Sequence, residues 1–391
     1  MIKILTFSTL FPNDQQPVHG IFVENRLRHL LSSGKVEARV VAPVPWFPLR
    51  QDCFGTYATY AKVCSAETRH GLDIIHPRYP LIPKVGMNWT PGFMYRALRP
   101  VIRKIIKDGY DFDLIDAHYF YPDGIAAAML AREFKKPLTI TARGTDLNLI
   151  PQFDKPRQMI KQAAEQASGL ITVCAALAEP LVDLGIDRSK IHVLRNGVDL
   201  TAFQPQDREQ ARQKLGLTGP TAVSVGGLIE RKGHHIAIAA MPGLPELTLL
   251  IAGAGPERRN LENLAQEKGV ADRVRFLGNV PHRDLPEIYS AADLMLLCSS
   301  REGWANVLLE SMACGTPVVA TDIWGTGEVV TCADAGVLME DRTPEAVVKG
   351  INSLLSALPT RTATRRYAEG FSWDDTTEGQ LNLFESILHG H

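Results

Sequence analysis

The sequence predicts an α/β protein made of two doubly wound, Rossmann-like domains. Short apolar runs alternate with amphipathic segments along the chain, a rhythm typical of parallel βαβ construction. The rhythm occurs twice, and 391 residues exceed the size at which one hydrophobic core stops growing. With 45% hydrophobic and 22% charged residues, the composition is that of an ordinary globular protein. We expect a ligand cleft between the domains, at the carboxyl ends of their strands.

The first half contains seven predicted strands: 3–7, 38–42, 72–75, 114–117, 138–141, 170–173 and 191–194. After the first strand, Val23, Leu27 and Leu30 recur at helical spacing and predict a helix with one apolar stripe. Three charged residues of this helix are expected on its solvent side: Glu24, Arg26 and Arg28.

The second half repeats the pattern, with predicted strands at 222–225, 247–252, 274–277, 294–297 and 317–320. Between the halves, Asn196-Gly-Val-Asp199 and the polar segment after it are typical of a crossing between domains. We therefore expect domains at 1–198 and 199–371, followed by a final segment at 372–391.

Charge and cysteine usage exclude several classes of protein. The chain has 42 Lys and Arg against 43 Asp and Glu, so no overall positive field attracts nucleic acid. Six cysteines without a CxxC pair argue against a disulfide scaffold or a zinc site of paired ligands, and favour a reducing compartment. Because we find no signal peptide and no apolar run of about 18 residues, we expect a cytoplasmic chain.

The densest motif is the segment from Arg301 to Pro317, which follows a predicted strand. Gly303 predicts a turn, Asn306 an N-cap, and Glu310 a carboxylate in the first turn of the helix. Such a helix start favours a phosphate, and Glu310 can accept hydrogen bonds from sugar hydroxyls, with Glu302 facing the cleft. The alternative is that Glu310 only complements the helix dipole and Glu302 is solvated.

The turn after the strand 222–225 carries Gly226 and Gly227, followed by Arg231 and Lys232. Glycines that allow close backbone approach, followed by two cations, suit a diphosphate. No Walker A loop is present, and the next turn, Gly253-Ala-Gly255, lacks the third glycine of a nicotinamide fingerprint. The alternative is a pair of tight turns with solvated cations.

In the first half, His118 ends a predicted strand, and Arg143 to Asp146 follow the next one. Strand ends of parallel sheets face the ligand site, so we expect His118 to face the cleft, although a lone histidine is more often structural. The Asp111-x-Asp113 pair resembles a metal-binding motif but lies at the start of its strand, so we interpret it as a solvated turn.

Residues 78–107 are basic and apolar, and contain no acidic residue. The cations are Arg78, Lys84, Arg96, Arg99, Arg103, Lys104 and Lys107. Two interpretations stay open, namely binding to an anionic membrane surface, on the inner face of the membrane, and a helix with a buried apolar side and a solvated basic side.

Taken together, these motifs resemble the retaining glycosyltransferases of family four, which have the GT-B fold. Glu302 and Glu310 match the family's Glu-x7-Glu motif, and further motifs follow in the family's order: Lys232-Gly233, Gly253-Ala-Gly-Pro256, Phe276-Leu-Gly278, Ala292-Asp293 and Gly315-Thr-Pro317. Weaker matches are a loop centred on Gly20, His118, Arg143 to Asp146, and Asn196 to Asp199. Within the family the chain is similar to bacterial enzymes that extend exopolysaccharides or cell-surface glycans.

The resemblance implies roles for single residues. Glu310 would bind the donor ribose, Lys232 the diphosphate and Glu302 the donor sugar, while Gly20 would let the first loop approach the phosphates. His118 would line the reacting sugar, on the acceptor side with Arg143 and Asp146. We expect the remaining donor contacts among Gly226, Gly227, Arg231, Gly253, Gly255, Asn279, Val280, Gly303, Trp304, Ala305, Asn306 and Val307. The family's final helix returns to the first domain, and residues 373–388 match it.

Two features depart from the family pattern. The family usually has arginine where this chain has Gly227, which makes Arg231 the candidate second phosphate cation. Where the family often has Gly-Gly before a later glutamate, this chain has Trp324-Gly325-Thr-Gly-Glu328.

The sequence thus predicts a metal-independent retaining glycosyltransferase without a cofactor. Its partners would be a nucleotide-diphosphate sugar as donor and a glycan or lipid-linked acceptor. The alternatives are a nucleotide-sugar epimerase on the same fold and a non-catalytic two-domain sugar-binding protein.

Overall fold

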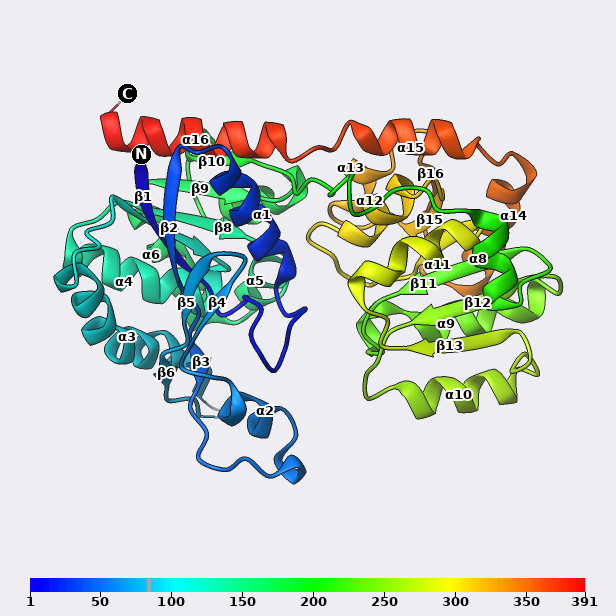
Figure 1. Cartoon of the computed structure of the whole chain (residues 1–391), viewed down its shortest axis with the longest axis horizontal. Helices are drawn as coiled ribbons and strands as arrows, with labels where there is room; N and C mark the ends of the chain where they lie inside the picture. Colours follow the sequence, from blue (N-terminus) through cyan, green and yellow to red (C-terminus); the bar gives the residue numbers. More distant parts are fainter. Residues whose placement is uncertain (83–85, 391) are drawn as a thin grey trace. The chain divides into compact units, whose positions relative to one another are not determined.

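The computed structural model describes residues 1–82 and 86–390, which form two compact α/β units (Figure 1). The first unit comprises Met1–Arg195 and Asp374–His391, and the second comprises Asn196–Trp373. Each unit has its own parallel sheet, so the predicted doubly wound α/β class is confirmed for both.

Within the described residues, the first unit is built on an eight-stranded sheet with the order β10-β9-β8-β7-β1-β2-β5-β4. The strands are β1 (Ile2–Phe7), β2 (Val36–Val41), β4 (Ala66–Arg69), β5 (Leu72–Ile75), β7 (Leu114–His118), β8 (Leu138–Ala142), β9 (Gly169–Thr172) and β10 (Ile191–Val193). Among the described strands of this sheet, only β4 runs antiparallel to its neighbour, and β3 (Val44–Pro45) and β6 (Arg78–Tyr79) form a separate parallel pair. Strand order reverses between β1 and β7, so the loops that follow these two strands adjoin.

The helices of this unit are α1 (Ile21–Ser32), α2 (Thr56–Lys62), α3 (Thr90–Lys107), α4 (Ile125–Phe134), α5 (Thr145–Asn148), α6 (Asp154–Gln166), α7 (Glu179–Asp183) and α16 (Asp374–His389). The last of these, drawn in red in Figure 1, rejoins the first unit after the whole second unit. Leu381 and Phe384 of α16 are buried in the same core as Val23 and Leu27 of α1.

The prediction that Glu24 and Arg26 lie on the solvent side of α1 is wrong. Both are 2% exposed, because Arg69 of β4 and Gln380 of α16 cover them. The Nε of Arg69 lies 2.9 Å from Oε1 of Glu24, and Nε of Arg26 donates to Oε1 of Gln380 at 2.8 Å. The apolar stripe of the helix predicts which side faces the core, but it does not show that polar residues of other elements bury the opposite side. Arg28 is exposed as expected.

In the described residues, the second unit is built on a six-stranded parallel sheet with the order β13-β12-β11-β14-β15-β16. The strands are β11 (Thr221–Val225), β12 (Thr248–Ala252), β13 (Val274–Gly278), β14 (Leu294–Leu297), β15 (Val318–Thr321) and β16 (Gly336–Met339). The helices are α8 (Arg208–Leu215), α9 (His234–Ala240), α10 (Arg258–Glu267), α11 (Leu285–Ala291), α12 (Asn306–Ala313), α13 (Thr326–Val329), α14 (Pro344–Ser356) and α15 (Arg361–Glu369). Strand order reverses between β11 and β14, the place where doubly wound sheets bind ligands.

Every predicted strand overlaps an observed one. The central strands are buried along their whole length and consist mostly of apolar residues, as expected for strands covered on both faces. Four strands were not predicted: β3, β4, β6 and β16. Two of them are two residues long, β4 alternates between exposed and half-buried residues, and β16 is an edge strand that starts at a glycine. β3, β4 and β6 give no apolar run, whereas β16 contains the short run Val337-Leu338-Met339, which was overlooked.

The basic stretch forms β6 and α3, and its interpretation as a core helix with a solvated basic side fits the structure. Met94, Leu98 and Ile102 are fully buried, so this apolar stripe serves the protein core. Arg96 and Lys107 are exposed, and Lys84 lies outside the described residues.

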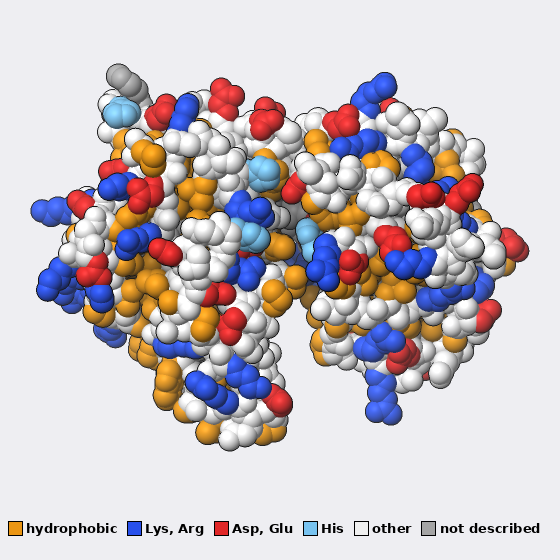
Figure 2. Space-filling model, in the orientation of Figure 1, with side chains coloured by type: hydrophobic (Ala, Val, Ile, Leu, Met, Phe, Trp, Pro, Cys, Tyr) orange, Lys and Arg blue, Asp and Glu red, His pale blue; other side chains and the backbone are white. Residues whose placement is uncertain are grey.

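Acidic groups neutralise part of the basic face of α3. The Nε of Arg99 and Nη2 of Arg103 lie 2.6 and 3.0 Å from Oε1 of Glu133 in α4, and Lys104 pairs with Asp108. Figure 2 shows Lys and Arg side chains with acidic side chains among them over the part of the first unit where Figure 1 places α3 and α4. Among the described residues, no helix is long and apolar enough to cross a bilayer.

Candidate functional site

In the second unit, the turn after β11 and the loop after β14 bring Lys232 and Glu302 together. β11 and β14 are parallel neighbours, so their carboxyl ends share one edge of the sheet. Lys232 lies in a short 3-10 turn, Glu230–Lys232, and its Nζ is 2.6 Å from Oε1 of Glu302. The two residues to which the resemblance gives the diphosphate and the donor sugar are thus ion-paired with each other.

Glu302 is a buried, ionised carboxylate, which contradicts the solvated interpretation. Its side chain is 10% exposed, and Nη1 of Arg231 lies 3.4 Å from the same Oε1 that Lys232 contacts. Burial acts to raise the pKa of Glu302, but the charges of Lys232 and Arg231 and hydrogen bonding hold it below its ordinary value. The negative charge is therefore kept at neutral pH.

Arg231 is directed to the same point as Lys232 even though the two are adjacent in sequence. Its Nη1 also donates to the backbone oxygen of Arg301 at 2.6 Å, which fixes the guanidinium beside the loop of Glu302. Gly227 lies in the same turn, where an added Cβ would meet nothing nearer than the oxygen of Ala254 at 3.8 Å. The turn therefore holds two converging cations and has room for a side chain at Gly227.

Two glycines let the backbones at this edge approach closely. A Cβ added at Gly253 would lie 1.9 Å from the oxygen of Gly226, and one added at Gly233 would lie 2.0 Å from the oxygen of Cys298. Both glycines have positive φ angles, +157° and +72°. The backbones of the turns after β11, β12 and β14 are therefore in close contact with one another at this edge of the sheet.

The structure corrects the predicted capping role of Asn306. Helix α12 starts at Asn306, and its cap position is Ala305, which has φ −83° and ψ 83°. Oδ1 of Asn306 accepts a hydrogen bond from Nδ2 of Asn196 at 3.3 Å, and no side chain in the described part of the chain caps the helix. Because Asn196 donates a hydrogen bond to this oxygen, Asn306 links the start of α12 to the crossing segment.

Glu310 is the fifth residue of α12, so the prediction that it lies in the first turn is also wrong by one turn. Its Oε1 is 3.1 Å from Nε2 of His282, and its Oε2 is 3.3 Å from the hydroxyl of Tyr289. Burial acts to lower the pKa of His282, but Glu310 raises it above its ordinary value. The carboxylate is thus held in place by two donors rather than by the helix dipole alone.

His282 and Tyr289 were missed in the sequence, although a signal was present. His282 follows β13 by four residues, as a polar residue at a strand's carboxyl end, and Tyr289 is fully buried in α11. The remaining predicted donor residues lie in the loops around them: Gly303, Trp304 and Ala305 are buried, Val280, Val307 and Gly253 are half-buried, and Asn279 and Gly255 are exposed. The segment 324–328, which departs from the family pattern, forms a turn and the start of α13.

In the first unit, His118 is the last residue of β7 and is 1% exposed. Its Nδ1 is 2.6 Å from Nη2 of Arg143, and its Nε2 is 3.2 Å from Oδ2 of Asp116. A guanidinium can only donate, so Nδ1 accepts and Nε2–H donates to Asp116. Burial, together with the charge of Arg143, lowers the pKa of His118 to about 4, so the ring is neutral at neutral pH.

Arg143 directly follows β8, next to His118, and Asp146 is the second residue of α5, which comes next. Both carboxylate oxygens of Asp146 accept backbone N–H groups, from Phe120 at 2.9 Å, Arg143 at 3.1 Å and Gly144 at 2.7 Å. The Asp146 carboxylate therefore orders the segment that follows His118 and the segment that contains Arg143. The guanidinium of Arg143 also lies 5.3 Å from the centre of the Phe22 ring.

A buried polar chain behind His118 was not predicted. Asp116 accepts from Oγ1 of Thr139 at 2.9 Å and from Nε2 of Gln380 at 3.0 Å. Gln380 in turn accepts from Nε of Arg26 at 2.8 Å. Gln380 lies 264 positions from Asp116 and 354 positions from Arg26 in the sequence, so no local pattern marks this connection. The final helix thus fixes the group that holds the His118 ring.

The loop after β1 adjoins the loop after β7, as the strand order requires. Gly20 is the cap residue before α1 and has φ +67°, and a Cβ there would lie 2.3 Å from the backbone of Leu10. Asp123, which was also missed, accepts from the backbone N–H of Thr9 at 2.6 Å. Burial raises the pKa of Asp123 to about 8. The predicted Gly20 loop is thus a compact turn anchored to the segment after His118.

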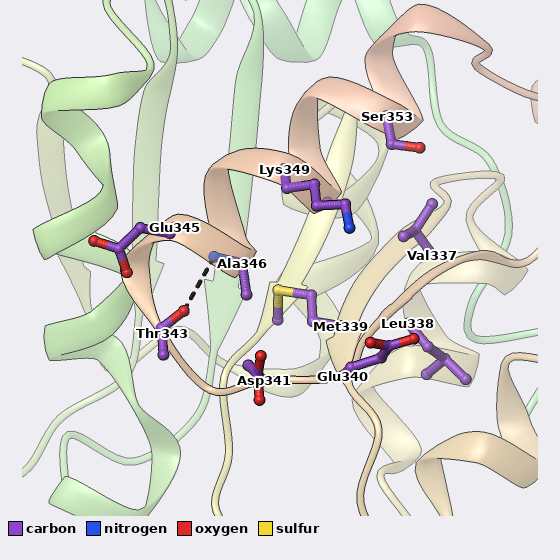
Figure 3. A pocket seen from close by; sticks show the side chains of 11 residues that line it. Val337, Leu338, Met339, Glu340, Asp341, Thr343, Glu345, Ala346, Lys349 and Ser353 are labelled. Carbon is purple, nitrogen blue, oxygen red and sulfur yellow. Dashed lines mark hydrogen bonds between the residues drawn. The ribbon is translucent and has the colours of Figure 1, made fainter.

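Two other features lie apart from this chemistry. A cavity of about 340 Å³ lies between β16 and α14 in the second unit (Figure 3), and it is lined by none of the predicted site residues. Thr343, one of its polar residues, accepts from the backbone N–H of Ala346 and so caps α14. Asp113 lies at the opposite end of β7 from His118, and its carboxylate accepts the N–H of Lys3 at 2.7 Å.

Two family models cover most of the chain. Residues 22–202 match the model described as Glycosyltransferase Family 4, and residues 206–371 match Glycosyl transferases group 1. A Bacillus subtilis protein named as a candidate teichuronic acid biosynthesis glycosyltransferase, TuaC, is 30% identical over 84% of this chain and 83% of its own. A D-inositol 3-phosphate glycosyltransferase of Rhodococcus erythropolis is 33% identical over 75% of this chain and 71% of its own.

Solved structures share the fold. A sucrose-phosphate synthase of Thermosynechococcus elongatus superposes with a TM-score of 0.82 at 21% identity, over 100% of both chains. HepE of Anabaena, solved with UDP-glucose, superposes with a TM-score of 0.72 at 19% identity, over 100% of this chain and 99% of its own. The family models and the sequence identity to TuaC over more than four fifths of both proteins show that the chain is a glycosyltransferase of family four. The superposed structures show that it has the GT-B fold.

Proposed function

We propose that this glycosyltransferase is a retaining enzyme that moves a hexosyl group from a nucleoside-diphosphate sugar to a glycan or a lipid-linked acceptor. The observation that carries the proposal is the convergence of Lys232 and Arg231 on Glu302 where the strand order of the second sheet reverses. The HepE structure with UDP-glucose supports the choice of donor class, and the family resemblance supports retention.

The diphosphate of the donor would take over the two cations. Lys232 and Arg231 now contact one oxygen of Glu302, and a dianionic diphosphate competes with that carboxylate for both. Glu302, released in part, would accept hydrogen bonds from hydroxyls of the donor sugar. One ion cluster would thus hold the phosphates and orient the sugar, and it is already assembled before the donor arrives.

Glu310 would bind the ribose. The two oxygens of a carboxylate can accept from the two neighbouring ribose hydroxyls. In Glu310, one oxygen contacts His282 and the other accepts from Tyr289. The ribose hydroxyls would share or replace these donors. His282, which carries a raised pKa beside Glu310, would then lie near the nucleoside.

The transfer itself would need positioning and charge stabilisation rather than a covalent nucleophile. As the glycosidic bond breaks, negative charge grows on the leaving diphosphate, and fixed cations stabilise that state more than the ground state. The acceptor oxygen would attack the face from which the phosphate leaves, and the phosphate would take the acceptor proton. His118 would contribute as a neutral ring that Arg143 and Asp116 hold in one orientation.

We also propose that the reaction needs no metal ion or cofactor, because Lys232 and Arg231 supply the positive charge for the diphosphate. The enzyme would act in the cytoplasm. Its contact with the membrane would be weak and electrostatic, through exposed cations of α3 such as Arg96 and Lys107, since the apolar side of α3 is buried.

A thermal-stability screen tests the proposal. UDP-, GDP- and ADP-sugars are added separately to the purified chain, and a ligand at about 100 times its dissociation constant adds about 2.7 kcal/mol of stability. One nucleotide-sugar should stabilise the wild type, and the stabilisation should be lost in Lys232→Ala. If no nucleotide-sugar raises the melting temperature, the proposed donor class is wrong.

A further inference from the structure

The hairpin formed by β4 and β5 brings together three side chains that the proposed reaction does not use. Cys64 lies two residues before β4, Glu67 lies on β4, and His76 follows β5. The pairing of β4 with β5 closes the hairpin, and the backbone N–H of His76 donates to the oxygen of Ser65 at 2.8 Å. As a result, Sγ of Cys64, a carboxylate oxygen of Glu67 and a ring nitrogen of His76 all lie within 4.8 Å of one another.

The hydrogen bond that Nδ1 of His76 makes to the backbone orients the other ring nitrogen, Nε2, toward this cluster. His76 is 1% exposed, and its Nδ1 lies 3.1 Å from the backbone oxygen of Ala42. A carbonyl oxygen can only accept, so Nδ1 carries a proton. In the neutral ring, Nε2 then carries a lone pair, and it faces Oε1 of Glu67 at 2.9 Å. Two acceptors at this distance need a cation between them, either a proton or a metal ion.

We propose that Cys64, Glu67 and His76 form a binding site for a thiophilic divalent cation of the Zn²⁺ class. Thiolate, imidazole and carboxylate are the ligand types of zinc, and a zinc-bound histidine usually donates its other ring N–H to an outer partner such as a backbone carbonyl. Ligand atoms on one tetrahedral zinc ion stand roughly 3.3–3.8 Å apart, so the side chains need only small shifts to close on an ion. The thiol proton of Cys64 leaves to solvent when the sulfur binds.

Asp14 strengthens the case for a cation. It belongs to the loop after β1, and its Oδ1 accepts the backbone N–H of Cys64 at 3.1 Å. This carboxylate adds a second negative charge next to the cluster without belonging to its three ligands. Three protein ligands leave one tetrahedral position for water. The bound ion would join the two ends of the hairpin to each other and, through Ala42, to the end of β2.

This inference is independent of the proposed glycosyl transfer, because the ligands lie in an edge hairpin of the first unit and not among the donor residues of the second. The sequence argued only against zinc sites made of paired CxxC ligands, and Cys64-x2-Glu67-x8-His76 is not one. β4 itself was not predicted, so no sequence pattern brought the three residues together.

Cobalt spectroscopy on the full-length, tag-free chain tests the site. The chain is stripped with a chelator, and Co²⁺ is titrated in while thiolate-to-cobalt charge transfer and the visible bands of four-coordinate Co²⁺ are recorded. We expect saturation at about one ion per chain and displacement by Zn²⁺. Cys64→Ser should abolish the charge-transfer band, whereas Cys53→Ser, which removes an exposed thiol of the same unit, should leave it unchanged.

Two further variants separate a bound ligand from a nearby charge. Glu67→Gln should weaken Zn²⁺ binding at least about tenfold, whereas Asp14→Asn should weaken it less than about tenfold. Zn²⁺ should raise the melting temperature of the wild type and of Cys53→Ser, but not of Cys64→Ser. Circular dichroism of each metal-free variant establishes that it is folded. Absence of saturable binding, or equal affinity in wild type, Cys64→Ser and Glu67→Gln, would overturn the proposal.

Discussion

Replacing either cation beside Glu302 should reduce turnover strongly. With an effective dielectric constant of about 20, separations of 2.6 Å for Lys232 and 3.4 Å for Arg231 give gross attractions to Glu302 of about 6 and about 5 kcal/mol. The two cations therefore act with similar strength on a charge at this position. Removing a preorganised charge partner costs about 10²–10³ in turnover, so Lys232→Ala and Arg231→Ala should both reach that range.

Steady-state kinetics with the donor found by stabilisation gives the readout. Arg259→Ala, which removes an exposed arginine of α10 in the same unit, is the matched control and should retain wild-type kcat. Gly227→Arg has room for its side chain and restores the cation that the family usually carries there, so it should partly rescue Arg231→Ala.

Stability must be separated from chemistry, because Lys232→Ala leaves a buried carboxylate with one partner fewer. Breaking a buried pair typically costs about 3–5 kcal/mol. Adding Glu302→Gln to Lys232→Ala should recover melting temperature without recovering turnover. An Arg231→Ala enzyme within about threefold of wild type, a difference of about 0.65 kcal/mol, would refute the role of Arg231.

Three further predictions concern pH, metal and membrane. The pKa of His118, lowered from 6.5 to about 4, implies folding stability that is present above pH 6.5 and is lost as the pH falls toward 4, on the order of 3 kcal/mol. An NMR titration should therefore show a neutral ring at pH 5, and His118→Asn should flatten the pH dependence of the free energy of unfolding. A ring that titrates near pH 6.5 would contradict this prediction. Full transferase activity should survive excess EDTA, and a loss that Mn²⁺ or Mg²⁺ restores would show that a metal takes part. Replacing Arg96, Arg99, Arg103 and Lys104 by Gln should abolish salt-sensitive binding to anionic vesicles, since each cation near the surface contributes about 1 kcal/mol; wild type that does not bind such vesicles would end the membrane proposal.

The central strands could be predicted because the residue types within each strand are enough to indicate it. β7, β8, β11 and β14 are covered on both faces, so every residue in them is buried and most of their residues are apolar. β4 carries charged and polar residues at the sheet edge, where burial imposes no such run. Glu24 and Arg26 were misplaced because their partners, Arg69 and Gln380, come from distant segments.

The candidate site was predictable in its loops but not in its pairing. Strand ends and turn glycines identified Lys232 and Glu302, and the parallel sheet brings their loops together. Which partner each charge takes depends on side-chain directions that the sequence does not encode locally, as with Glu310 and His282. The cap at α12 was misassigned because the oxygen of Asn306 bonds Asn196 instead of the helix backbone.

The central claim is sugar transfer with retention at the anomeric carbon. The stabilising nucleotide-sugar is incubated with the enzyme and a panel of glycan and lipid-linked acceptors, and the product is followed by NMR from the first turnovers. We predict a new glycosidic bond with the anomeric configuration of the donor, absent with Lys232→Ala. An inverted product would contradict the retaining mechanism, and an isomerised donor without a new glycosidic bond would contradict transfer itself.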